Sequence, residues 1–219
     1  MKKLFISTVL AFAACSTQEA PSEEMTEAQE TELANLQPAV TRAGHLRFTT
    51  NAIHDPRAAR VFLDRLAAGT ESEAVRAALV EALPRTGGEY ADEVLRLMAK
   101  ETSPMVRAAY AHTARRAPDA QAIAIAERGL ADSSPEVVAE AIRATASLAD
   151  GARLAGALRA SLSSRDADVR KEAARAIGIL NIALARNELD ALAFDSSPDV
   201  RREAARAVTR IDGSATTTR

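Results

Sequence analysis

Aromatic side chains are scarce in this chain of 219 residues: they make up 3% of it, and tryptophan is absent. Base-stacking platforms, aromatic-lined ligand pockets and membrane aromatic belts all depend on such side chains, so the composition is poor material for them. From residue 42 on, 26 basic residues stand against 24 acidic ones. A nucleic-acid-binding domain is usually clearly basic, so we expect no nucleic acid as partner.

Residue sets typical of catalysis or metal binding are also missing. The histidines His45, His54 and His112 are far apart and do not follow a metal-binding spacing such as HExxH. The chain has no second cysteine, no GxSxG sequence and no phosphate-binding glycine loop. We therefore expect no enzyme, no cofactor, no metal site and no small-molecule substrate.

The single cysteine, Cys15, directly follows a short apolar stretch. The chain opens with MKK and continues with eleven apolar or small residues from Leu4 to Ala14. A charged start before such a stretch is typical of a secretory signal peptide, here residues 1–14, and the stretch is too short to span a bilayer as a stable helix.

The residues FAAC, from Phe12 to Cys15, resemble the lipobox of bacterial lipoproteins. In that family the cysteine is lipidated and becomes the new N-terminus, although a leucine usually stands where this chain has Phe12. The resemblance implies an exported protein anchored in a membrane through Cys15. Because Ser16 is not Asp, it implies the outer membrane rather than the inner one. The alternative is ordinary cleavage that leaves a free thiol.

Five valines recur at spacings of 31, 31, 32 and 31 residues, and a fixed period in this range is typical of a solenoid. A residue favoured as a helix N-cap stands three positions before each valine, and Pro follows that residue in three of the five units. Each valine is therefore predicted in the first turn of a helix. The valines are Val75, Val106, Val137, Val169 and Val200, and the predicted caps are Ser72, Ser103, Ser134, Asp166 and Ser197.

Apolar residues after each valine recur at steps of three and four, as in Val169, Ala173, Ala176, Ile177 and Leu180. Another apolar, helix-like stretch precedes each such helix. Each unit is then a helical hairpin that buries its apolar face only by stacking on its neighbours. The sequence predicts an all-α protein, an α-solenoid of about five repeats of 31–32 residues over residues 55–211, followed by a disordered tail over 212–219.

The recurring pattern SPxVRxxAxxA(L/I) resembles HEAT repeats, especially the short bacterial type. In that family the arginine after the valine commonly bonds polar groups between adjacent repeats, and the second helix lines the concave side. The resemblance implies a protein–protein interaction scaffold, here tethered to a membrane of the bacterial cell envelope. The alternative that it leaves open is a HEAT-like lyase or assembly-factor enzyme that uses the concave groove. The arginines are Arg76, Arg107, Arg170 and Arg201, whereas the third unit has Val138.

The segment before the five units is strongly acidic, with six Glu and no Lys or Arg over residues 16–41. Its start is small and polar, which predicts a flexible tether over 15–23. The QPAV sequence at 37–40 is similar to the start of a repeat helix, so a degenerate N-terminal capping repeat is predicted over 24–54.

The second and sixth residues after each valine are expected to face outward on the second helix. Read along the stack, these pairs change from neutral or acidic to basic, which suggests a groove whose C-terminal half receives an acidic segment of an envelope protein. The alternative is a solvated helix face, because Glu140, Glu172 and Glu203 precede arginines by three residues and can pair with them. The pairs are Ala77/Glu81, Ala108/His112, Ala139/Arg143, Lys171/Arg175 and Arg202/Arg206, so the partner-binding candidates are His112, Arg143, Lys171, Arg175, Arg202 and Arg206.

Overall fold

The computed structural model describes residues 56–87 and 89–217, with side chains described through residue 214. The predicted signal peptide, Cys15, the tether and the predicted capping repeat lie outside these residues. The described part is helical throughout and holds no strand, and none of its helices is long and apolar enough to cross a membrane.

Five helical hairpins follow one another along the described chain. Their first helices are α2 (Pro56–Ala68), α4 (Ala91–Met98), α6 (Asp119–Leu130), α8 (Ala155–Ser161) and α10 (Arg186–Ala191). Their second helices are α3 (Glu73–Thr86), α5 (Pro104–Thr113), α7 (Pro135–Thr145), α9 (Ala167–Ile179) and α11 (Pro198–Thr217). Four short 3-10 helices lie between them: η2 (Ala114–Arg116), η3 (Gly151–Leu154), η4 (Ala183–Ala185) and η5 (Leu192–Phe194).

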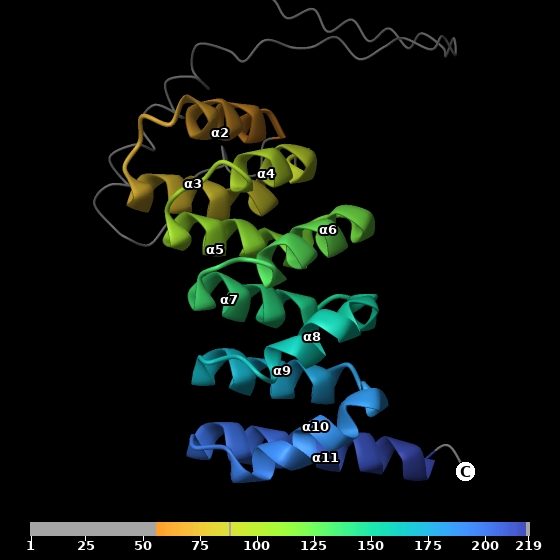
Figure 1. The fold of residues 1–219 in the computed structure, drawn as a ribbon. Helices are drawn as coiled ribbons and strands as arrows, with labels where there is room; N and C mark the ends of the chain where they lie inside the picture. The colour runs from red at the N-terminus through yellow and green to blue at the C-terminus, as the bar shows by residue number, and fades with distance from the viewer. Residues whose placement is uncertain (1–55, 88, 218–219) are drawn as a thin grey trace, which may run out of the picture.

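The second helices lie side by side in one layer, and each contacts the next along the stack (Figure 1). The first helices form a second layer against them. Repeats that are distant in the sequence do not share an extensive contact within the described part. The predicted α-solenoid is therefore confirmed.

The second helices begin where the N-cap pattern predicts. The side chains of Ser72, Ser103 and Asp166 accept hydrogen bonds from the backbone N–H of the valines three residues later, at 3.4, 3.5 and 3.0 Å. These bonds satisfy backbone donors that have no partner inside a helix. Ser134 also precedes its helix, but its side chain forms no such bond.

Small residues let the second helices approach closely. A Cβ atom added to Gly178 in α9 would lie only 2.7 Å from the Cα atom of Ala207 in α11. The buried side chains form two clusters, one from α2 to η3 and one from α7 to α11. Helix α7 contributes to both, with Ala141 in the first cluster and Ile142 in the second.

The predicted disordered tail is wrong for residues 212–217, because α11 continues through Thr217. Two contacts hold this extension in place, one to Asn181 in the turn after α9 and one to Arg186 at the start of α10. The hydroxyl of Ser214 donates to the Asn181 Oδ1 at 2.8 Å, and the Asp212 carboxylate pairs with Arg186 at 3.1 Å. Such contacts override the weak helix propensity of Gly213 and the residues around it.

Candidate interaction surface

A stripe of charged side chains crosses the second helices in the C-terminal half of the stack. We call it the polar stripe. Its anionic members occupy the third position after the valine in units three to five, where the first two units have Ala78 and Ala109. The polar stripe consists of His112 and Arg115 from α5 and η2, Glu140 and Arg143 from α7, Lys171, Glu172 and Arg175 from α9, and Arg202, Glu203, Arg206 and Arg210 from α11.

Glu140 links two neighbouring helices of the stripe. Its carboxylate lies 2.8 Å from His112 Nδ1 and 3.3 Å from Arg115 Nη2 on one side, and accepts from Arg143 Nε at 2.9 Å. Burial alone would raise the pKa of Glu140, but hydrogen bonds from His112 and Arg143 and their charges lower it to about 2. The carboxylate is therefore ionised at neutral pH.

Glu172 repeats this link between helices further along the stripe, whereas Glu203 contacts two arginines of its own helix α11. Glu172 lies 3.4 Å from Arg175 in its own helix and 3.7 Å from Arg143 in α7. Glu203 contacts Arg206 at 3.1 Å and Arg210 at 3.3 Å. These glutamates are only 11–12% exposed, so the cations that surround them form the outer surface of the stripe.

The predicted binding residues differ in how far they reach into solvent. Arg143 and Lys171 are about one-third exposed, whereas Arg202 and Arg206 are about two-thirds exposed, at 67% and 65%. His112 and Arg175 lie between these values. The structure brings His112 and Arg143 together through Glu140, and Lys171 and Arg175 through Glu172. It shows no such bridge between Arg202 and Arg206, which pair with Asp199 and Glu203 separately.

Two alanines of the predicted outward pairs are not outward. Ala77 and Ala139 are buried, with 8% and 5% of their surface exposed. Adjacent second helices approach closely at these positions and cover a side chain as short as a methyl group. The longer Lys171 and Arg202 occupy the corresponding positions in later units and reach solvent. Sequence reasoning also missed Arg115 and Arg210, which lie outside the second and sixth positions that it followed.

The arginines after the valines form a ladder between repeats, as the HEAT resemblance implied. Arg107 donates from Nε and Nη2 to both oxygens of Asp132 in the next unit, at 2.7 and 3.0 Å. Its Nη1 donates to backbone carbonyls of its own inter-helix turn. Arg76 with Glu101 and Arg170 with Asp195 repeat this arrangement. These guanidinium groups are engaged in the fold, which argues against a row of ligand-binding arginines.

Each carboxylate of the ladder also orders the turn that carries it. The oxygens of Glu101, Asp132 and Asp195 accept the backbone N–H two residues later, each at 2.8 Å. Burial opposes the ionised form of Asp132, but the bonds from Arg107 and from the Ser134 N–H lower its pKa overall.

The ladder is interrupted once and has one open end in the described part. Val138 stands where the other units have arginine, and Ser164 occupies the carboxylate position of the next turn. Arg201 donates to the carbonyl oxygens of Asp195 and Ser196, at 2.6 and 3.2 Å, but has no ion pair with a described residue.

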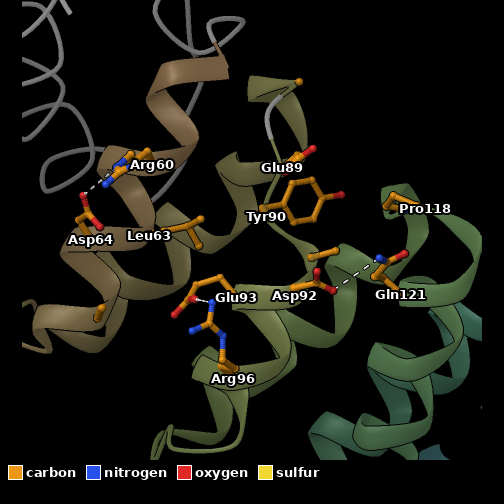
Figure 2. Close-up of a pocket in the computed structure, with 13 residues that line it drawn as sticks. Arg60, Leu63, Asp64, Glu89, Tyr90, Asp92, Glu93, Arg96, Pro118 and Gln121 are labelled. Atoms are coloured by element: carbon orange, nitrogen blue, oxygen red, sulfur yellow. Dashed lines mark hydrogen bonds and ion pairs between the residues drawn. The ribbon is translucent and has the colours of Figure 1, made fainter. Parts of the chain in front are cut away.

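A pocket of about 930 Å³ lies in the layer of first helices (Figure 2). Residues of α2, of the turn before α4, of α4 itself and of the start of α6 line it, among them Leu63, Tyr90, Asp92 and Gln121. The described residues contain no group of three His, Cys, Asp or Glu side chains that could hold a metal ion.

Residues 59–149 match the family model for HEAT repeats. No curated protein matches the chain. Among solved structures, the chain is similar to an engineered protein from the Northeast Structural Genomics Consortium, with a TM-score of 0.53 and 21% identity over 88% of this chain and 93% of that one. It is also similar to a designed armadillo repeat protein, with a TM-score of 0.50 and 19% identity over 87% of this chain and 96% of that one. At these identities the likeness is one of fold.

Proposed function

We propose that this α-solenoid is a protein-interaction scaffold whose polar stripe receives an acidic segment of a partner. The observation that carries the proposal is the run of cations across α7, α9 and α11, on helices whose apolar faces are already used in stacking. Stacked repeats offer extended surfaces of this kind for binding other proteins. The match to HEAT repeats supports the scaffold role.

The charges of the stripe favour an anionic partner even after internal pairing. Each buried glutamate is shared by at least two cations: Glu172 lies within 4 Å of Arg143, Lys171 and Arg175. A carboxylate carries a single negative charge, so the two or more cations around it keep an excess of positive charge. Lys171 and Arg202 also pair with the exposed Asp168 and Asp199, so the remaining excess of positive charge is exposed mainly at Arg175 and Arg206.

We further propose that a lipid on Cys15 tethers the scaffold to a membrane of the bacterial cell envelope, with the outer membrane favoured. The support is the FAAC sequence behind a signal-like stretch and the acidic segment that would separate the lipid from the repeats. The acidic partner would then be another envelope protein.

Neutralising the stripe tests the scaffold proposal without leaving a glutamate uncompensated. In a variant with Lys171, Arg175, Arg202 and Arg206 changed to Gln, Glu172 keeps Arg143 and Glu203 keeps Arg210. A fluorescein-labelled peptide of eight glutamates serves as the probe, followed by capture from detergent-solubilised envelopes. We expect the variant to bind the peptide at least about tenfold more weakly at low salt, with unchanged helicity.

A second variant provides a matched control with the same change in net charge. It carries Gln at four exposed cationic positions outside the stripe, Lys100, Arg128, Arg153 and Arg165. It should bind the peptide, and the proteins captured from envelopes, like the wild type. If both variants bind the peptide equally weakly, net charge alone drives binding. If the stripe variant binds the peptide as tightly as the wild type, the polar stripe is only a solvated helix face.

The tether is tested separately. Replacing Cys15 with Ser should abolish incorporation of radiolabelled palmitate and release the protein from the membrane fraction, whereas Ser16→Ala keeps the thiol and should keep the label. A Cys15→Ser protein that is still labelled and still sediments with membranes would contradict the lipoprotein interpretation.

A further inference from the structure

The pocket in the first-helix layer has more negative charge than its own cations neutralise. Four carboxylates and two arginines line it. Arg60 pairs with Asp64 at 4.0 Å, and Arg96 pairs with Glu93. Both arginines are therefore engaged, and neither of the remaining two carboxylates forms an ion pair with a described residue. The charge of Arg116 opposes the rise that burial causes in the pKa of Tyr90, so this arginine lies near the pocket without pairing with either carboxylate.

These two carboxylates are Glu89, just before Tyr90, and Asp92, in the first turn of α4. Asp92 accepts one long hydrogen bond from Gln121 Nε2 at 3.5 Å, and no described residue bonds to Glu89. In Figure 2 they lie on either side of the Tyr90 ring. Both carboxylates thus line the pocket without an ion pair to a described residue.

The hydroxyl of Tyr90 is a second, independent feature of this pocket that points to a ligand. Its side chain lines the pocket and is only 7% exposed, yet its buried hydroxyl has no hydrogen-bond partner among the described residues. A buried polar group without a partner costs about 1–3 kcal/mol, so such groups are rare unless a ligand or another molecule completes them.

We propose that this pocket binds the guanidinium group of an arginine side chain presented by a partner protein. A guanidinium has five donors in a planar fork, which suits the two carboxylates and the Tyr90 hydroxyl. The aliphatic stem of the arginine would contact the apolar part of the lining, Leu63, Ala67 and Pro118. This site lies in the other helix layer from the polar stripe and takes the opposite charge, so it does not depend on the function of the stripe.

The test is a titration of the full, isotope-labelled chain followed by NMR. The probe is N-acetyl-arginine amide, and N-acetyl-lysine amide and N-acetyl-glutamine amide are the comparisons. We expect the arginine probe to shift the amide signals of residues 89–93 and 119–121 most, with millimolar affinity. The lysine probe should bind more weakly and the glutamine probe should not bind measurably.

Three variants distinguish pocket binding from general attraction to an acidic surface. Glu89→Gln with Asp92→Asn should weaken binding of the arginine probe by at least about tenfold, because both charge-assisted bonds are lost. Glu127→Gln removes an exposed carboxylate of α6 outside the pocket and should leave binding unchanged. Tyr90→Phe should weaken binding several-fold while the melting temperature stays equal or rises, because it removes only a hydroxyl without a partner.

Several results would overturn the proposal. Equal affinity for the glutamine probe would exclude recognition of charge, and equal affinity for the lysine probe would exclude recognition of the guanidinium. Signal shifts that map outside the pocket, or unchanged binding in the double variant, would exclude the site. A lower melting temperature of Tyr90→Phe would show that the hydroxyl already has a partner inside the protein.

Discussion

Arg170 and Asp195 face each other across the interface between the fourth and fifth repeats and share two parallel hydrogen bonds, at 2.7 and 2.8 Å. The same guanidinium donates from Nη1 to the carbonyl oxygens of Ser164 and Arg165 in its own turn. One side chain thus orders the turn of its own repeat and the turn of the next. The arginine ladder therefore fixes the register of stacking, in addition to the apolar contacts.

Removing one arginine of the ladder should destabilise the stack. In Arg107→Met, Asp132 keeps only the N–H of Ser134, and two backbone carbonyls lose their donor. Because the pair is largely buried, we expect a loss of about 2 kcal/mol in the free energy of unfolding, measured in urea. Arg107→Lys should recover only part of this, since an ammonium group cannot form the two parallel bonds.

The exposed Arg202 is the control for this experiment. It has a single exposed ion pair, so Arg202→Met should change stability by no more than about 0.5 kcal/mol. If Arg107→Met costs no more than Arg202→Met, the ladder does not stabilise the stack.

The gap in the ladder should be repairable. The Oγ of Ser164 accepts the N–H of Asp166 at 3.2 Å, as the ladder carboxylates accept the N–H two residues later in other turns. Val138→Arg together with Ser164→Asp should therefore rebuild the missing pair. In a double-mutant cycle we expect a favourable coupling of about 1 kcal/mol or more between the two substitutions, and a coupling near zero would contradict the assigned register.

Two glycine substitutions should have opposite effects. A Cβ at Gly178 would meet both the Cα and the Cβ of Ala207, at 2.7 and 2.8 Å, so Gly178→Ala must push α9 and α11 apart and should cost about 1–3 kcal/mol. A Cβ at Gly156 in α8 meets nothing within 4 Å, so Gly156→Ala should stabilise the protein by up to about 1 kcal/mol. Thermal unfolding followed by circular dichroism compares them, and equal shifts would contradict the close approach of the helices.

Acid should lower the stability of the folded protein through protonation of Glu140. Its pKa in the folded protein is about 2, below the ordinary 4.5, so its stabilising contribution is present above pH 4.5 and is lost as the pH falls toward 2. Between pH 7 and pH 3 the wild type should lose about 2 kcal/mol more than Glu140→Gln does. Glu101, Asp132 and Asp195 also have lowered pKa values, but they titrate in both proteins and cancel in the difference. Parallel pH profiles would contradict this role of Glu140.

The repeat architecture could be predicted because its signals are local and recur. A cap residue, a proline and a valine in phase predict where each second helix begins, and the structure places Val106, Val137 and Val200 fully inside. The pairing of Arg143, Arg175 and Arg206 with the glutamates three residues before them also follows from spacing along one helix.

What could not be predicted depends on contacts between repeats. Gly213 and Ser214 are poor helix formers, and the contacts of this segment with Asn181 after α9 and with Arg186 of α10 explain why α11 continues past Ile211. Tyr90 directly precedes α4, and nothing in its local sequence shows that its hydroxyl is buried without a partner among the described residues. The burial of Ala77 and Ala139 likewise depends on how closely the next helix approaches.

The missing arginine at position 138 bears on how the protein carries mechanical load. Between α7 and α9 the turns lack the two parallel bonds that tie other repeats together, and the apolar contacts of this interface belong to the second cluster. Among the described side chains, this interface has apolar contacts and the Arg143–Glu172 ion pair but no ladder pair, so we expect it to yield before its neighbours when the stack is pulled along its length. The stack then behaves as two stiff segments joined by a compliant one, and the spacing of the cations on either side of α7 changes with tension.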